Sequence, residues 1–558
     1  MLTIVLLALI GVLSTVAGVH GNSQIENEFG RPVQHQSTGG TPWPKPQMMT
    51  TTSVTYPLAD PATFRIFQMT KTDCPILDQA FTRYFNTIFF GTPELSEETK
   101  LKKLEEMRRQ GRFWNAALHG ENPPAVTGLS VSISDCSEMY PSLSSSENYT
   151  LDVSEPTAAI AAHSAWGALR GLETFSQLVY ESSLATLIVN KTSITDFPRF
   201  AHRGFLVDSS RHFLSVDVLL QFLDAMAYNK FNVFHWHIVD DQSFPYESKA
   251  FPYMSQQGAY SPSYVYSQDD VKRVIVYARD RGIRVIPEFD TPGHTQSWGS
   301  VKGLLTPCED KSGKPTGDYG PINPILNSTY EFLQPFFKEI FQVFPDEYIH
   351  VGGDEVSFDC WKSNKDIQHF MAQMGYGQNY SKLEAYYEKR FLGIVEGLLA
   401  KPIVWQEVVD NGVKINLDSV VEVWKTPWPK ELQNVTQRGY RALLSTPWYL
   451  SQAVVPGQDW HKIYSVEPLM FNGTAAQKAL VFGGEACMWG EYVDSTNLIQ
   501  RSWPRGCAVA ERLWSAEKVR DVKEAAPRLA EQRCRMVRRG LKAEPVTGPG
   551  FCESPGRK

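Results

Sequence analysis

The sequence predicts an α/β fold in which a (β/α)8 TIM barrel over residues 201–558, including C-terminal helices, is preceded by a smaller α+β domain over residues 61–200. From Arg203 onward, short runs of β-branched residues alternate with amphipathic helical segments. This alternation is typical of parallel strands joined by helical crossovers. Eight strands within about 320 residues fit a closed barrel, which takes about 250 residues or more.

An open, doubly wound sheet is the alternative arrangement for the same alternation of strands and helices. That fold carries a glycine-rich phosphate-binding turn after its first strand. The residues at this position are Asp208-Ser-Ser-Arg211, which do not form such a turn. The closed barrel is therefore favoured.

Each expected barrel strand is a short β-branched run, and each expected helix has apolar residues at helical spacing. The strands are expected at 204–208, 232–239, 283–289, 347–351, 402–405, 420–424, 442–445 and 480–483. The helices are expected at 216–228, 268–281, 329–343, 383–399 and 505–514. In the smaller domain, alternation predicts strands at 129–134 and 149–153, and the stretch 158–182 is predicted to be a helix.

The composition is that of a globular protein with a large core. Of the 558 residues, 42% are hydrophobic and 21% are charged, and 54 Lys and Arg against 61 Asp and Glu give a net charge of −7. The chain lacks the basic stripe of a nucleic-acid binder, so no nucleic-acid partner is expected. It also lacks the long like-charge runs of an acidic disordered chain.

The N-terminus predicts entry into the secretory pathway. Residues 1–18 read as a signal peptide, apolar to about Val16 and ending in small residues. A signal anchor is the alternative, although about 17 apolar residues are few for a membrane span. No other stretch approaches this length, so no integral span is expected after signal removal. Residues 19–60, rich in Gly, Pro, Thr and Gln, are predicted to be an N-terminal tail.

The eight cysteines show no Cys-x-x-Cys spacing, so disulfides are favoured over a zinc or redox site. Proximity in sequence suggests Cys74–Cys136, Cys308–Cys360 and Cys534–Cys552, while Cys487 and Cys507 lie in apolar stretches that suit buried free thiols. Six Asn-x-Ser/Thr sequons indicate glycosylation at Asn148, Asn190, Asn327, Asn379, Asn434 and Asn472. These features agree with a lysosomal or secreted protein.

Polar and aromatic residues recur where the expected barrel strands end. In this fold the C-terminal strand ends meet on one face and form the active site. A single acidic residue after a strand is usually a helix cap, but a ring of such positions indicates a site. In strand order, these positions hold Asp208 and Arg211; Asp240 and Asp241; Asp290 and His294; Asp354 and Glu355; Trp405 and Glu407; Trp424; Trp448 and Tyr449; and Glu485, Trp489 and Glu491.

Carboxylates surrounded by tryptophans favour carbohydrate chemistry. Indole faces stack on sugar rings, and carboxylates and arginine bind hydroxyl groups. Glycoside hydrolysis commonly uses two carboxylates about 5–9 Å apart, one on each side of the scissile bond. The adjacent pair Asp354-Glu355 does not suit that arrangement. It suits one acid acting on the leaving group and one carboxylate orienting a group of the substrate itself.

The motifs at these positions resemble those of family 20 glycoside hydrolases. The resemblance covers most of residues 60–556, including the smaller domain, and is strongest to the subunits of animal lysosomal β-N-acetylhexosaminidases. It is carried by His202-Arg-Gly-Phe-Leu-Val-Asp-Ser-Ser-Arg211, Asn232-Val-Phe-His-Trp-His-Ile-Val-Asp-Asp241, Glu288-Phe-Asp-Thr-Pro-Gly-His294, His350-Val-Gly-Gly-Asp-Glu355, Trp405-Gln-Glu, Pro447-Trp-Tyr449, Gly483-Gly-Glu-Ala-Cys-Met-Trp-Gly-Glu491 and Trp166-Gly-Ala-Leu-Arg-Gly-Leu-Glu-Thr-Phe.

The resemblance implies removal of a terminal β-linked N-acetylhexosamine from a glycan, with retention, through attack by the substrate's own acetamido oxygen. It implies no cofactor and no metal, and it implies a dimer. The implied catalytic residues are Glu355, as acid and then base, and Asp354, which holds the acetamido group. The implied substrate-binding residues are Arg211, Asp240, His294, Trp405, Trp424, Tyr449, Trp489 and Glu491.

One position departs from the resemblance. The lysosomal subunits carry either Asn-Arg, which helps accept anionic substrates, or Asp-Leu, which contacts a sugar hydroxyl. This chain has Ser451-Gln452, which supplies neither the cation nor the carboxylate.

Two other functions remain open at this stage. One is a two-carboxylate retaining glycosidase with Glu288 or Glu407 as nucleophile, and the other is a sugar-binding protein without catalysis.

Two further patterns are given structural interpretations. His235 and His237 share one face of a strand; with no third ligand at matching spacing, they are interpreted as a satisfied buried pair in preference to metal ligands. Arg533–Arg539 is interpreted as a solvated helix face in preference to a partner surface.

Overall fold

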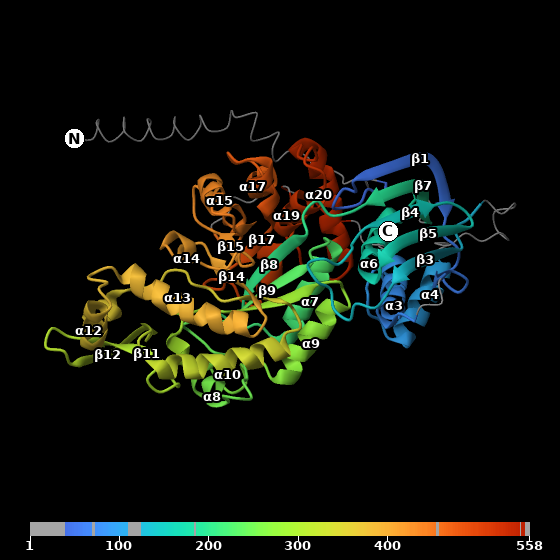
Figure 1. The fold of residues 1–558 in the computed structure, drawn as a ribbon. Helices are drawn as coiled ribbons and strands as arrows, with labels where there is room; N and C mark the ends of the chain where they lie inside the picture. The colour runs from blue at the N-terminus through green and yellow to red at the C-terminus, as the bar shows by residue number, and fades with distance from the viewer. Residues whose placement is uncertain are drawn as a thin grey trace, which may run out of the picture.

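The computed structural model describes residues 39–552 except 70–72, 110–123, 183–185, 453–456, 547 and 549. A small domain built on one sheet lies beside a closed barrel surrounded by helices (Figure 1). The predicted signal peptide, residues 1–18, lies outside the described residues. No helix in the described part of the chain is both long enough and apolar enough to cross a membrane.

The small domain is a seven-stranded mixed sheet with helices packed on it. The strands lie in the order β1, β7, β4, β5, β3, β2, with β6 paired to β7. Their bounds are β1 Met48–Pro57, β2 Arg65–Gln68, β3 Gly128–Asp135, β4 Tyr149–Val153, β5 Thr157–Ser164, β6 Tyr180–Glu181 and β7 Leu187–Asp196. The helices are α3 Pro75–Phe90, α4 Glu97–Arg109 and α6 Ala165–Leu178. Every residue of α6 is buried, because this helix lies between the sheet and the barrel (Figure 1).

Two expectations for this domain are wrong. The predicted tail, residues 19–60, includes β1, which pairs antiparallel with β7 along the edge of the sheet. The predicted helix 158–182 begins as strand β5, and only its second part is helix α6. Alanine-rich residues 158–162 favour a helix locally, but pairing with β3 and β4 decides their conformation, since tertiary context overrides weak propensities.

The barrel is closed by eight parallel strands, as the sequence predicted, and the doubly wound alternative is excluded. The strands are β8 His202–Asp208, β9 Val233–Val239, β10 Arg284–Phe289, β13 Tyr348–His350, β14 Lys401–Trp405, β15 Val420–Val423, β16 Arg441–Leu444 and β17 Val481–Met488. All lie within the expected runs or extend them by a few residues. A two-stranded hairpin, β11 Leu305–Glu309 and β12 Pro315–Ile322, is inserted after β10.

Helices surround the barrel on its outside (Figure 1). Two of the five predicted helices have the expected bounds, and the other three differ by a few residues at one or both ends. The larger helices are α7 Val216–Tyr228, α9 Gln268–Arg279, α10 Asn327–Val343, α13 Tyr380–Gly397, α15 Trp428–Gln437, α19 Arg505–Trp514 and α20 Val522–Arg538. The shorter ones are α8 Tyr253–Gly258, η2 Gln296–Trp298, α11 Asp359–Ser363, α12 Lys365–Gln373, α14 Glu407–Asp410, η3 Thr446–Trp448, α16 Asp459–Ser465, α17 Ala475–Leu480 and α18 Leu498–Ser502.

The two domains meet around one buried carboxylate, that of Glu147. It accepts hydrogen bonds from Arg170 of α6 at 2.8 Å, from Arg203 of β8 at 2.6 and 2.7 Å, and from Asn232 at 3.1 Å. Arg170 also donates to the carbonyls of Arg281 and Gly282. Charges from both domains therefore neutralise each other in a buried interface.

The helix α20 contributes to the same interface, contrary to its interpretation as a solvated face. Arg535 is buried and donates to the carbonyl of Thr41 at 2.6 Å, and Arg539 pairs with Glu173 of α6 at 2.8 Å. A run of basic residues read from sequence does not reveal that its partners come from a distant domain.

The structure contains the three disulfides suggested by proximity in sequence, Cys74–Cys136, Cys308–Cys360 and Cys534–Cys552. Cys487 and Cys507 are buried free thiols, also as expected.

We expect Glu147→Ala to lower the free energy of unfolding by about 3–5 kcal/mol, because two buried guanidinium groups lose their counter-charge. Denaturant unfolding followed by tryptophan fluorescence measures this change. The control is Glu98→Ala, which removes an exposed pair with Lys102 and should cost at most about 1 kcal/mol. Equal losses in the two variants would contradict the role of Glu147.

Candidate active site

The adjacent carboxylates Asp354 and Glu355 lie in the turn that follows β13. Gly352 and Gly353 have φ angles of 73° and 97°, in the left-handed region that favours glycine. A Cβ on Gly352 would overlap the Asp290 carboxylate, whose Oδ1 accepts the Gly353 N–H at 2.9 Å. Glu355 also has a positive φ, 51°. The turn is therefore tight, and Asp290 fixes it by packing against Gly352 and accepting a hydrogen bond from Gly353.

The two carboxylates have different surroundings. The side chain of Asp354 is 12% exposed, whereas that of Glu355 is 60% exposed. His294 lies between them: its Nε2 is 3.6 Å from Asp354 Oδ2 and 3.9 Å from Glu355 Oε2. One carboxylate is therefore set into the protein and the other faces outward, with an imidazole next to both.

His294 is held by Asp240, whose Oδ1 is 3.1 Å from His294 Nδ1. Burial lowers the pKa of His294, but the bond to Asp240 and the charges of Asp354 and Asp240 outweigh it and raise this pKa to about 9. The imidazole is therefore a cation at neutral and acidic pH. It balances charge among the carboxylates that surround it.

Asp240 itself connects several elements. Its Oδ2 lies 2.7 Å from His237 Nε2 and 2.7 Å from a guanidinium nitrogen of Arg211. Burial acts to raise the pKa of Asp240, but His237, His294 and Arg211 outweigh it and lower that pKa. Asp240 is therefore an anion, and it fixes the positions of His294 and Arg211.

Four aromatic side chains form a continuous wall. Trp424 and Tyr449 have nearly parallel rings, 6.2 Å apart, and Trp489 is 6.2 Å from Tyr449 and 6.0 Å from Trp405. Arg211 lies over the ring of Trp489, 5.2 Å from its centroid. The structure thus brings together the aromatic residues that sequence placed at four separate strand ends.

Glu288 of β10 lies in the barrel interior, below this wall. Its carboxylate accepts from Trp405 Nε1 at 2.8 Å and lies 2.5 Å from His237 Nδ1 and 3.1 Å from His235 Nε2. His237 and His235 each have a carboxylate on both nitrogens, which confirms that they are a satisfied buried pair. His235, Glu288 and His350 bring ligand-type atoms within 4.8 Å of one another; His350 Nδ1 lies 3.1 Å from Glu288 Oε1 and accepts from the Gly352 N–H.

The geometry disfavours a two-carboxylate mechanism. Glu288 is fully buried and already bonded to Trp405 and two histidines. Glu407 accepts from Trp424 Nε1 at 2.6 Å and pairs with Lys425 at 2.5 Å, and its Oε1 faces the Glu355 backbone N–H at 3.4 Å. Both carboxylates hold other groups in place instead of presenting a free oxygen.

Several residues of the predicted ring are held by structural hydrogen bonds. Glu485 lies within β17 and bonds His202 and His235 inside the barrel. Trp448 is buried and donates to the Ile463 carbonyl. Asp241 accepts from the Gln296 backbone, and Asp208 accepts from Arg211 and the Gly490 N–H. These carboxylates shape loops, which is the ordinary role of an acidic residue after a strand.

Three residues at the rim of the site are less confined. Glu491 is exposed, and its charge acts on Arg211. Ser451 is half-buried and its carbonyl accepts from Arg501 at 2.7 Å, while Gln452 is exposed.

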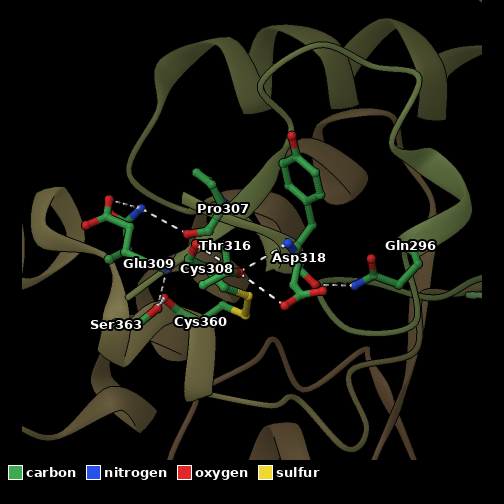
Figure 2. The surroundings of a disulfide bond; sticks show 10 residues. Gln296, Pro307, Cys308, Glu309, Thr316, Asp318, Cys360 and Ser363 are labelled. Atoms are coloured by element: carbon green, nitrogen blue, oxygen red, sulfur yellow. Dashed lines mark hydrogen bonds between the residues drawn. A yellow bond between two sulfur atoms is a disulfide. The ribbon is translucent and has the colours of Figure 1, made fainter. Parts of the chain in front are cut away.

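A disulfide ties the hairpin β11–β12 to the segment after Glu355. Figure 2 shows Cys308, which lies on β11, joined to Cys360 of α11. The Ser363 hydroxyl accepts from the backbone of Glu309 at 3.0 Å (Figure 2). Gln296 donates to the carbonyl of Tyr319 at 2.8 Å. The insertion after β10 and the loop after β13 are thereby held together.

Sequence reasoning missed the residues that support the site from within. Asp290 was noted only as a strand-end acid, and His237 only as half of a histidine pair. Glu384 and Glu388 of α13 were not noted at all, although both are buried. Acids one turn apart on a helix usually mark a solvated face, so no sequence signal identified them.

Comparison with known proteins agrees with this architecture. Residues 200–517 match the catalytic domain of glycosyl hydrolase family 20, and residues 42–178 match a domain described as β-acetyl hexosaminidase-like. The β-hexosaminidase subunit alpha of Rattus norvegicus is 50% identical, over 92% of this chain and 94% of that protein. The β-hexosaminidase subunit beta of Homo sapiens is 48% identical, over 99% of this chain and 96% of that protein.

Solved structures agree as well. A chitobiase of Flavobacterium johnsoniae has a TM-score of 0.76 at 30% identity, over 91% of this chain and 74% of its own. An exo-β-N-acetylglucosaminidase of Vibrio harveyi shares the fold, with a TM-score of 0.72 at 23% identity, over 93% of this chain and 80% of its own. The chain belongs to glycosyl hydrolase family 20.

Proposed function

We propose that this protein hydrolyses terminal, non-reducing β-linked N-acetylhexosamine residues of glycans, with retention, through an oxazolinium intermediate formed by the substrate's acetamido group. One observation carries the proposal. Two adjacent carboxylates, one set into the protein and one facing outward, lie close to a wall of four aromatic side chains. The charge of Asp354 acts on Tyr449, and Glu407 bonds both the Glu355 backbone N–H and Trp424. The relatives named β-hexosaminidase, about 50% identical over most of the chain, support this assignment.

The exposed carboxyl of Glu355 acts as the general acid. It protonates the oxygen of the departing group while the acetamido oxygen attacks the anomeric carbon, so the glycosidic bond breaks as the ring of the oxazolinium ion closes. The Glu355 carboxylate then takes a proton from the water that opens this ring. Its 60% exposed side chain leaves room for the leaving group and for the water.

The buried carboxylate of Asp354 acts on the acetamido group. It accepts the acetamido N–H, orients the oxygen toward the anomeric carbon and stabilises the positive charge that develops on the ring. The Tyr449 hydroxyl donates a hydrogen bond to the acetamido oxygen. Burial, followed by the charges of Cys487 and Glu422, raises the pKa of Tyr449, so this hydroxyl remains a donor.

The remaining site residues bind the sugar or hold the catalytic residues in place. Trp405, Trp424 and Trp489 line the sugar site, and Arg211 and Glu491 bind hydroxyl groups. Asp240 holds His294 next to both carboxylates, as its 3.1 Å contact with the imidazole indicates. His294 in its cationic form limits the repulsion between Asp354 and Glu355.

We further propose processing in the secretory pathway, with removal of residues 1–18, a lysosomal or extracellular destination, and assembly as a dimer. Among the sequons, Asn148, Asn327, Asn379 and Asn472 are exposed and suit glycan attachment. Asn190 and Asn434 suit it less. The Asn190 amide donates to the Thr52 carbonyl and accepts from Tyr180, and Asn434 is half-buried within α15.

Glu355→Gln is expected to abolish the hydrolysis of substrates with poor leaving groups, and to spare activated phenyl β-N-acetylglucosaminides much more. A phenolate that leaves without protonation does not need the acid. Steady-state kcat/KM over a series of leaving groups measures the difference. Equal losses on both kinds of substrate would rule out the acid assignment.

A substrate that lacks the 2-acetamido group is expected to be cleaved at least about 10³-fold more slowly, because the internal nucleophile is absent. A matched pair of chromogenic N-acetyl-β-glucosaminide and β-glucoside substrates provides the measurement. Similar rates would instead favour a two-carboxylate glycosidase. No turnover of either would favour a sugar-binding protein.

The acceptance of anionic substrates is best tested with neutral and 6-sulfated N-acetylglucosaminides and N-acetylgalactosaminides. Ser451-Gln452 adds no cation, so we expect kcat/KM to favour the neutral substrate of each pair. A preference for the sulfated substrates would require a cation from elsewhere on the rim.

A further inference from the structure

Two acidic residues on helix α13, Glu384 and Glu388, are buried side by side behind the catalytic turn. They lie one helical turn apart, and their side chains are 0% and 1% exposed. In the part of the chain that the structure describes, neither carboxyl pairs with a Lys, Arg or His. The reaction described above uses neither residue.

Glu388 borders the turn that carries Asp354 and Glu355. Its Oε1 would lie 3.8 Å from a Cβ placed on Gly353, and this oxygen has no hydrogen-bond partner among the described residues. The same turn packs against Val408 of helix α14, whose side chain a Cβ on Gly353 would overlap. The Glu388 carboxyl is therefore part of the surface on which the turn rests.

Glu384 reaches the same turn through α14. Its two oxygens accept from Asn411 Nδ2 at 3.1 and 2.9 Å, and Asn411 ends helix α14. At the start of α14, Glu407 faces the backbone N–H of Glu355 and bonds Trp424. A short helix of four residues thus connects Glu384 with both the general acid and the aromatic wall.

Burial without a cation favours the neutral form of both carboxyls. For Glu384, burial and the charge of Glu407 outweigh the bond from Asn411 and the charge of Lys425, and they raise its pKa to about 7. Burial and the charge of Glu384 raise the pKa of Glu388. The other titratable groups facing this pair are Tyr387 and Tyr330, both neutral because burial raises their pKa.

We propose that Glu384 and Glu388 are positioning residues that support the catalytic turn in their protonated form. The active site therefore keeps its geometry at acidic pH and loosens as Glu384 ionises. Ionised Glu384 would face the carboxylate of Glu407, and their repulsion would shift α14 away from the Glu355 backbone. The proposal rests on the proposed function for its activity measurement. Its stability measurement needs no substrate, so the two can fail separately.

The sign of the pH dependence follows from linkage. The pKa of a Glu in the unfolded chain is about 4.3, whereas the pKa of folded Glu384 is raised to about 7. Between these values the unfolded chain has lost the proton and the folded chain keeps it, so the free energy of unfolding falls as pH rises. From about pH 5.5 to about pH 7.5, the unfolding equilibrium constant rises by up to about 20-fold from this group alone.

The test is Glu384→Gln, which stays neutral and can still accept from Asn411. Glu331→Gln, an exposed acid on α10, is the matched control. We expect thermal inactivation of the wild type and the control to accelerate between about pH 5.5 and pH 7.5 by about 10-fold more than that of Glu384→Gln. The fall of kcat on the alkaline side of its pH profile should also shift to higher pH in Glu384→Gln, with little change in KM.

The same pH dependence of inactivation in all three proteins would overturn the proposal. So would a shift of the kcat profile in the control as large as that in Glu384→Gln. If Glu384→Gln does not fold, the wild type can be tested directly. Its difference infrared spectrum should show the signal of a buried protonated carboxyl that disappears near neutral pH. Absence of such a signal would also overturn the proposal.

Discussion

The carboxylate of Glu288, buried at the centre of the barrel, is the group on which the active site depends. An ionised carboxylate is stable in such an interior only with close donors and counter-charges. Here Trp405, His235 and His237 surround it, and although burial acts to raise the pKa of Glu288, the charges of its histidine neighbours lower it well below the usual range. Burial lowers the pKa of His237, but Glu288 and Asp240 raise it to about 10.

Through these contacts, Glu288 in the barrel interior fixes the positions of side chains in the active site. One oxygen of Glu288 fixes the indole of Trp405 in the aromatic wall. The other fixes His237, which fixes Asp240, which in turn fixes both Arg211 and His294. Every link is a charge-assisted bond in a setting of low dielectric, where such bonds are strong and their loss is costly. A site built in this way needs little rearrangement when substrate arrives.

The same balance of buried charge operates at two other places, with different outcomes. At the domain interface, Glu147 meets two guanidinium groups and stays ionised, since burial is outweighed by Arg203 and Arg170 and its pKa is lowered. On α13, Glu384 and Glu388 meet no cation, and the raised pKa of each carboxyl keeps it neutral at acidic pH. The ionised Glu147 joins the two domains by pairing with arginines. The carboxyls of Glu384 and Glu388 support the catalytic turn in their neutral form. Whether a buried acid is ionised therefore depends on which elements pack around it.

The sequence by itself determined the eight-stranded barrel, the three disulfides and the set of strand-end residues that includes Asp354, Glu355, His294 and the four aromatics. The barrel and the strand-end set follow from local periodicity and from short motifs, and the disulfides follow from pairing cysteines that are neighbours along the sequence. It did not determine the edge strand β1 or the strand β5, because pairing with distant strands decided both. The resemblance left Trp448 out of the substrate-binding set, and the tertiary structure supplies the physical reason: Trp448 belongs to the core, whereas Trp424 and Trp489 belong to the aromatic wall. Only the tertiary structure revealed that Glu288, Asp290, Glu384 and Glu388 support the site from within. The physical reason is that burial and the identity of a charge partner are properties of packing between segments far apart in the chain, which no local pattern encodes.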